Sequence, residues 1–161
     1  MKKLLLILSM ILILPIQIAH ASSVSICDLN VEDLISRCNQ ILLANGFQPI
    51  TFDSIENRDE NQLYIYNHGN SRAVFVVNSR DKIEQALISF QVASDESSNS
   101  GFESAESILR AIELTEDERN TLFEGDNPIS VWSSVLNRRI VIEGAQDDAG
   151  IGYISITAED Q

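Results

Sequence analysis

The hydrophobic pattern between residues 47 and 92 constrains the fold of this chain most strongly, because it repeats every second residue between short polar turns. A period of two is typical of β-strands with one buried face. The turns at residues 69–70 and 79–81 are short enough to join antiparallel neighbours directly. The stretch therefore predicts a meander of four antiparallel strands, around residues 50–53, 62–67, 72–78 and 83–92.

Residues 28–46 show instead the spacing of an amphipathic helix. Asp28 or Asn30 can serve as its N-cap, and Gly46 marks its end. The helix has one apolar face that must be covered, which consists of Val31, Leu34, Ile35, Cys38, Ile41 and Leu42.

The composition changes most sharply at residues 93–101, which are rich in Ser, Asp, Glu and Asn and predict a mobile loop within the domain. Three helices are expected after this loop. The first presents an apolar face over residues 105–112, and the second begins with a capping box formed by Thr115 and Glu118. The third opens at Asn127 and Pro128 and contains Val131, Trp132, Val135 and Leu136.

Two further strands, residues 139–143 and 153–157, flank a loop with Gly and Asp and predict a hairpin at the C-terminal end. Helices on one face of an antiparallel sheet would bury their own apolar stripes and one face of the strands. We therefore expect the α+β class, with a four-strand meander plus a C-terminal hairpin in one antiparallel sheet and helices packed on one face. The pattern leaves the strand order open.

Residues 1–21 have the features of a secretory signal peptide. Two lysines precede an apolar run over residues 4–14, and Ala19 and Ala21 are the small residues of a cleavage site. A membrane-spanning helix is the competing interpretation, but the run is shorter than the roughly 20 residues that a bilayer requires. We expect residues 22–161 to form a single exported domain, periplasmic or secreted, without a stable membrane anchor after cleavage.

The chain is strongly acidic, with 24 Asp and Glu against 11 Lys and Arg and a formal net charge of −13. Negative charge repels phosphate backbones and anionic lipids, which argues against nucleic acid or a membrane surface as partner. A basic protein would be attracted. An acidic surface also keeps an exported protein soluble, so the charge alone does not require a partner.

The two cysteines, Cys27 and Cys38, both lie near the start of the expected domain. Because export leads to an oxidising compartment, we expect them to form a disulfide between the N-terminal segment and the first helix. Such a bridge would stabilise the domain by about 2 to 3 kcal/mol. A lipid anchor on Cys27 is disfavoured, since the preceding Ile26 is larger than the small residue that such a site needs.

No pattern in the sequence indicates catalysis, a cofactor or a metal ion. Beyond the expected signal peptide His68 is the only histidine, and no nucleophile motif accompanies it. The acidic groups at residues 59–60 and 116–118 lack the alternating spacing of a calcium loop. Asp147 and Asp148, in a loop flanked by glycine, are the best placed of the acids for a cation, but a solvated turn is the favoured interpretation.

Tyr64, Tyr66 and His68 are candidates for a binding surface, because they share one side of the second strand. If Leu63 and Ile65 face the helices, these three side chains project from the opposite face of the sheet. Exposed amphipathic aromatic residues are typical of protein interfaces. Loops or a second copy covering that face are the competing interpretation.

Two functions from different classes fit this sequence. The first is a small exported, non-enzymatic binding protein, such as an inhibitor or immunity-type factor for a basic protein partner. The alternative is a small exported hydrolase that uses scattered carboxylates. A cleft with two carboxylates of separated pKa values would favour the hydrolase, and an aromatic binding face would favour the binding protein.

Overall fold

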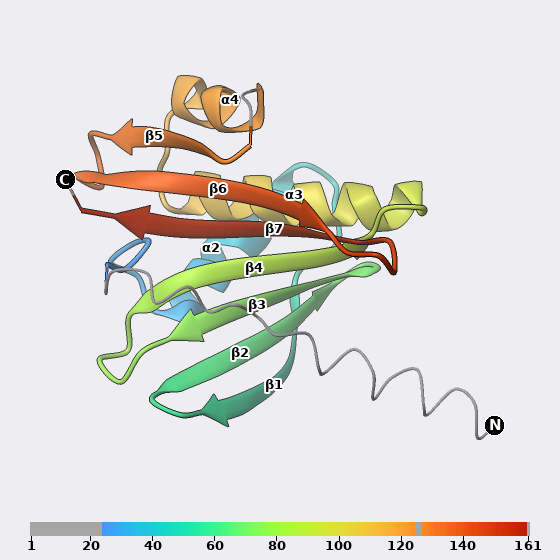
Figure 1. Ribbon diagram of the computed structural model, residues 1–161, viewed down its shortest axis with the longest axis horizontal. Coiled ribbons are helices and arrows are strands. Elements are labelled where there is room, and N and C mark those ends of the chain that lie inside the picture. Colours follow the sequence, from blue (N-terminus) through green and yellow to red (C-terminus); the bar gives the residue numbers. More distant parts are fainter. Residues whose placement is uncertain (1–23, 125–126, 161) are drawn as a thin grey trace.

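The computed structural model describes residues 24–124 and 127–160, and the expected signal peptide lies outside them. The described part contains three helices and seven strands, shown in Figure 1. The elements in chain order are α2 (Val31–Ala44), β1 (Thr51–Arg58), β2 (Asn61–His68), β3 (Ser71–Val77), β4 (Ile83–Gln91), α3 (Asp95–Ala111), α4 (Glu116–Glu124), β5 (Ile129–Ser133), β6 (Arg138–Gln146) and β7 (Ile151–Glu159).

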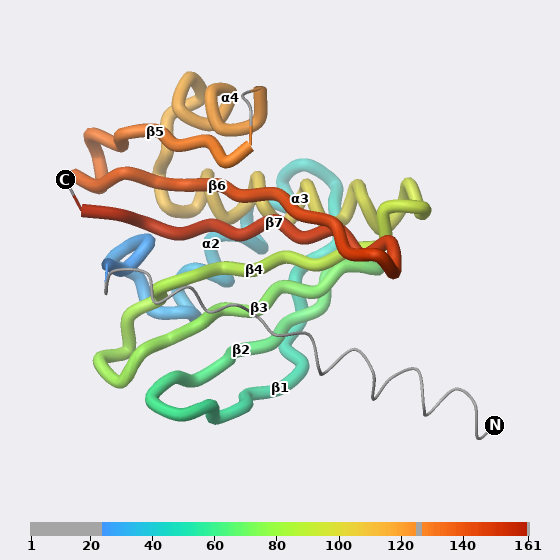
Figure 2. The backbone as a smooth tube through the Cα atoms, in the orientation of Figure 1, coloured from blue at the N-terminus to red at the C-terminus, as the bar shows by residue number. Residues whose placement is uncertain are grey.

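The seven strands form one antiparallel sheet in the order β1-β2-β3-β4-β7-β6-β5. The C-terminal strand β7 therefore joins the meander by pairing with β4, as Figure 2 also shows. Helices α2 and α3 contact each other and lie behind the sheet in the view of Figure 1. The predicted α+β class, with a meander, a C-terminal hairpin and helices on one face, is confirmed.

Two helices begin with the caps that their sequences predict. At the start of α2 the side chain of Asn30 accepts a hydrogen bond from the backbone N–H of Asp33 at 2.8 Å. Before α4, Thr115 and Glu118 exchange the two bonds of a capping box. Each cap satisfies backbone N–H groups that have no partner within the helix.

Residues 93–101 are mostly helical, so the predicted mobile loop is wrong. Helix α3 begins at Asp95, and the Ser94 side chain accepts a hydrogen bond from the N–H of Ser97. Its serines suit a helix here because the hydroxyls of Ser100 and Ser104 donate to carbonyl groups one turn earlier. Their small side chains then allow the helix to lie close to the sheet.

The third helix predicted after Pro128 is also wrong, because residues 129–133 form the edge strand β5. Ile129 and Val131 are β-branched, and both pack on the helix side against the buried core. Pairing with β6 outweighs the apolar spacing that resembles a helix. The hairpin predicted after it is confirmed and is longer than expected, with β6 and β7 each spanning nine residues.

Candidate functional site

The proposed exposed surface of Tyr64, Tyr66 and His68 is wrong in its orientation. Tyr66 is 6% exposed and belongs to the core between sheet and helices, where its ring meets Phe75 edge-on at 5.8 Å. His68 is 2% exposed and contacts α3. This side of β2 therefore faces the helices, and Leu63 and Ile65 take the opposite side. Because those two residues are buried as well, the apolar alternation did not show which side faces the helices.

His68 fastens the end of β2 to α3. Its Nδ1 lies 2.9 Å from the Ser104 hydroxyl and 3.0 Å from the Ser100 carbonyl oxygen, and its Nε2 lies 3.8 Å from a carboxylate oxygen of Glu103. Ser104 is fully buried, and its hydroxyl donates to the Ser100 carbonyl. A substrate has no access to that hydroxyl, so the cluster is suited to holding helix and sheet together rather than to nucleophilic attack.

Cys27 and Cys38 are both buried and are present as free thiols in the structure. Burial is the largest cause of the raised pKa of Cys27, and it raises the pKa of Cys38 to about 12. The expected disulfide is thus absent from this structure. A thiol of such high pKa carries little thiolate at neutral pH and is a poor nucleophile.

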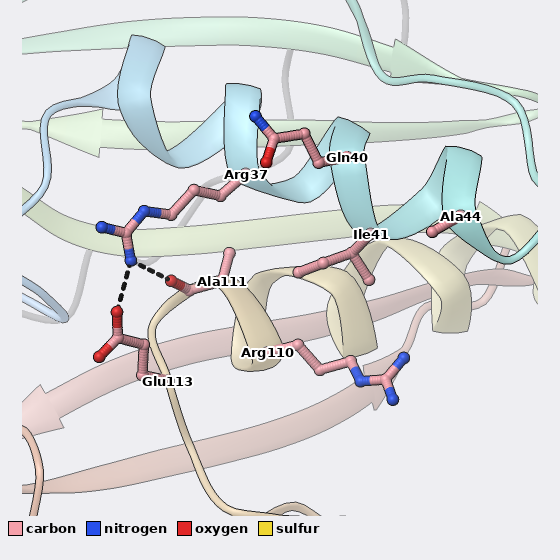
Figure 3. A pocket seen from close by; sticks show the side chains of 7 residues that line it. All are labelled: Arg37, Gln40, Ile41, Ala44, Arg110, Ala111 and Glu113. Carbon is pink, nitrogen blue, oxygen red and sulfur yellow. Dashed lines mark hydrogen bonds and ion pairs between the residues drawn. The ribbon is translucent and has the colours of Figure 1, made fainter.

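A first cavity, of about 410 Å³, lies between α2 and α3. Arg37 on its wall forms an ion pair with Glu113 at 2.7 Å and donates to the Ala111 carbonyl at 3.4 Å. Figure 3 shows the guanidinium of Arg110 directed away from that of Arg37. The two cations do not converge on a common point, so this cavity does not offer an anion clamp.

A second cavity, of about 500 Å³, is an apolar groove beside the N-terminal half of α3. We call it the phenylalanine groove, because Phe90, Phe102 and Phe123 line it together with Leu122, Ile142 and Ile154. Phe102 is 50% exposed and Phe123 is 39% exposed, so their rings form an open apolar rim. Phe90 lies deeper, with its ring centroid 5.6 Å from that of Phe102. The groove can bind an apolar side chain and remove it from water.

At one edge of the phenylalanine groove a side chain, and not a backbone segment, pairs with the backbone of β6. The side chain of Asn127 accepts a hydrogen bond from the Gly144 N–H at 2.7 Å and donates to the Gly144 carbonyl. Backbone pairing between β5 and β6 ends at Ile129 and Ile142, so the Asn127 amide continues the ladder for one more step. Beyond this step β6 runs on past β5, as Figure 1 shows.

The sequence around the phenylalanine groove is acidic. Among described residues, the charged side chains next in sequence to a lining residue are Glu103, Glu124, Glu143 and Asp147. No described Lys or Arg adjoins a lining residue in this way. Glu143 points to the other face of the sheet and Glu103 faces His68, so these charges lie off the groove wall. With the net charge of −13 they favour a positively charged partner through the field of the whole protein.

Asp147, one of the two acids that the sequence placed best for a cation, is bonded within its own hairpin. Its carboxylate accepts hydrogen bonds from the backbone N–H groups of Ala149 and Ile151 and from the Tyr153 hydroxyl at 3.1 Å. These bonds, led by the one from Ile151, lower the pKa of Asp147. Within the described ranges no three His, Cys, Asp or Glu side chains gather as a metal site would require.

Comparison with known proteins finds no family model, no curated protein and no solved structure that matches this chain. Among the helices that the structure describes, none has both the length and the apolar character needed to cross a bilayer.

Sequence reasoning missed the phenylalanine groove. Its three rings come from β4, α3 and α4, and nothing local marks them as neighbours. Phe102 and Phe123 carried one signal, since each is a large apolar residue inside a polar segment.

Proposed function

We propose that this protein is a small exported binding protein, periplasmic or secreted, which binds a basic protein partner without catalysing a reaction. The observation that carries the proposal is the phenylalanine groove, an open apolar cavity in a strongly acidic protein. Burying one large apolar side chain there would contribute about 1.5 to 3 kcal/mol. The net charge of −13 would increase the rate of encounter with a cationic partner.

A role as inhibitor or immunity-type factor is the specific form of this proposal. Such a protein must recognise its target without altering it, and the groove supplies contact surface without an ionisable pair. Among the described residues that line the groove, Tyr153 alone has a titratable side chain. Its burial, and then its hydrogen bond to Asp147, raise its pKa to about 12.

The alternative, a hydrolase that uses carboxylates, would need two acids facing one cavity. Of the residues that the structure describes, no acid lines the phenylalanine groove, and Glu113 is the single acid on the cavity between α2 and α3, where it is paired with Arg37. The binding function therefore has the stronger support.

Photo-crosslinking tests the proposed function. A photoreactive group would be placed at Ser98, which lines the groove, and the cross-linked proteins would be identified from the exported fraction of the source cells. We expect a basic protein to be cross-linked, and Phe123→Ser to reduce the yield at least about tenfold, because the partner loses an apolar contact.

Leu43→Ser is the matched control, since Leu43 is an exposed apolar residue on α2, 60% exposed and away from the groove. It should leave the cross-linking yield unchanged. Equal losses in the two variants, or cross-linking of acidic and basic proteins alike, would contradict the proposed function.

A further inference from the structure

The edge of β6 beside the phenylalanine groove has backbone groups to which the described residues offer no partner. Alternate residues of an antiparallel strand direct their N–H and C=O groups towards opposite neighbours. Gly144 directs both groups towards Asn127, so Gln146, two residues further on, directs its groups the same way. Gln146 is exposed, and no described residue pairs with it on that side.

Asn127 shows what kind of group this edge accepts. Its side-chain amide has a carbonyl and an N–H, as a peptide unit does, and it meets both backbone groups of Gly144. A peptide strand entering beside β6 could take over these bonds and continue to Gln146. Adding a strand to a free sheet edge is an established mode of peptide recognition, in which backbone bonds supply affinity and side-chain pockets supply specificity.

We propose that the ligand of the phenylalanine groove is an extended segment of the partner, which adds to the sheet as a strand along Gly144 and Gln146 and displaces the Asn127 amide. This inference rests on the proposed function and specifies how the partner binds. The side chains of the added segment alternate between the two faces of the sheet. Those opposite Gly144 and Gln146 point to the helix side, where the groove lies, and are apolar.

The side chains in between point to the other face of the sheet and are basic. Ile142 is buried on the helix side, so Glu143, the next residue of β6, lies on that other face. A Lys or Arg at the intervening position of the added strand lies opposite Ala145, diagonally from Glu143, within reach of its carboxylate for a long side chain. The partner segment therefore alternates apolar and positively charged residues, which satisfies the groove and the acidic surroundings together.

Binding of short blocked peptides to the exported protein tests this inference. The probe is a peptide in which Val alternates with Lys, measured by calorimetry against two versions N-methylated at every second residue. One version blocks the N–H groups that point to β6, and the other blocks those that point away. We expect only the first to lose affinity, by about tenfold or more, since about two hydrogen bonds are lost.

Two variants of the protein make the test independent of the peptide chemistry. Gln146→Pro removes the outward N–H, and proline is tolerated on a sheet edge, so the fold should persist while peptide affinity falls about fivefold. Leu43→Ser, on α2 and away from the groove, is the control and should bind as the unaltered protein does. Asn127→Ala removes the competing amide and should tighten binding roughly threefold to tenfold.

Equal loss of affinity from both N-methylated peptides would overturn the strand addition, as would tighter binding of a helix-forming peptide of the same composition. In that second case Phe123→Ser would still weaken binding, so the proposed function would stand while this inference failed. If no peptide binds and cross-linking is also insensitive to Phe123→Ser, both fail.

Discussion

Gly101 of α3 lies directly against the ring of Phe90 on β4, so that a Cβ added to Gly101 would collide with a carbon of this ring. Gly152 on β7 approaches the same ring, with a Cβ distance of 2.7 Å. The ring is therefore held between a helix and a neighbouring strand at two positions without side chains. This contact fixes the depth of the phenylalanine groove, because Phe90 forms part of its wall.

Gly101→Ala should destabilise the protein, even though alanine favours helices over glycine by about 1 kcal/mol. The added methyl group collides with the near side of the Phe90 ring, and overpacking of this kind costs about 1 to 3 kcal/mol. We expect a net loss of roughly 1 kcal/mol in the free energy of unfolding, measured by urea denaturation.

Asn99→Ala is the control for this substitution, because Asn99 is an exposed residue of the same helix. It should leave stability unchanged or increase it by a few tenths, on the order of 0.5 kcal/mol. A Gly101→Ala variant as stable as the Asn99→Ala variant would show that Phe90 can move aside at no cost.

His68→Ala should destabilise the domain by about 2 to 4 kcal/mol, because it leaves a buried cavity and removes the partner of Ser104. Ser104→Ala should cost about 1 kcal/mol, since the Ser100 carbonyl remains within reach of His68. In a double-mutant cycle the two losses should not add, because both remove the same hydrogen bond. Strict additivity would mean that His68 does not hold α3 through Ser104.

The meander could be predicted from the sequence because the patterns that specify it involve residues close together in the chain. Alternation through residues 62–67 and the turn at Gly69, whose φ of 53° suits glycine, both act between neighbours in the chain. The face that β2 turns to the helices could not be predicted, since both sides of the strand carry apolar or aromatic residues. Only packing against Phe75 and α3 decides between Tyr66 and Ile65.

The N-terminal part of α3, up to residue 101, was missed for a related reason. Serine favours turns and loops when its hydroxyl is free to bond to the backbone nearby. In α3 the hydroxyls of Ser100 and Ser104 bond within the helix, and Ser97 also donates to the Asn70 carbonyl in the turn between β2 and β3. These bonds depend on the sheet beneath the helix. The phenylalanine groove depends in turn on α3, so it was equally out of reach of local patterns.

The disulfide between Cys27 and Cys38 stays a prediction, and it applies to the protein exported as we propose. Denatured without reductant, that protein should contain no free thiol if oxidation precedes burial of the two side chains. Thiol titration after denaturation measures this directly. Two reactive thiols per chain would show that Cys27 and Cys38 are reduced in the cell, as they are in the structure.

For the reduced protein we predict slow alkylation of Cys38 in the folded state. A pKa raised from 9.0 to about 12 lowers the thiolate fraction at pH 8 by about a thousandfold. The folded state holds the proton more tightly, so this contribution to stability is complete below pH 9.0 and is lost as the pH rises through about 12. A Cys27→Ser variant isolates Cys38 for the measurement. Alkylation at the rate of the unfolded chain would contradict the prediction.

Asp147→Ala should lower the pKa of Tyr153 from about 12 towards 10.0. The carboxylate accepts a hydrogen bond from the Tyr153 hydroxyl, and its negative charge opposes ionisation of that hydroxyl. Burial is the larger cause of the raised pKa and remains in the variant, so the pKa should stop above 10.0. Absorbance titration of the tyrosinate, in a protein that also carries Tyr64→Phe and Tyr66→Phe, follows Tyr153 alone.

Asp147→Ala also removes the hydrogen bonds from Ala149 and Ile151, so hydrogen exchange should accelerate at the tip of the β6–β7 hairpin. An unchanged pKa for Tyr153 would mean that its hydroxyl is not bonded to Asp147 in solution.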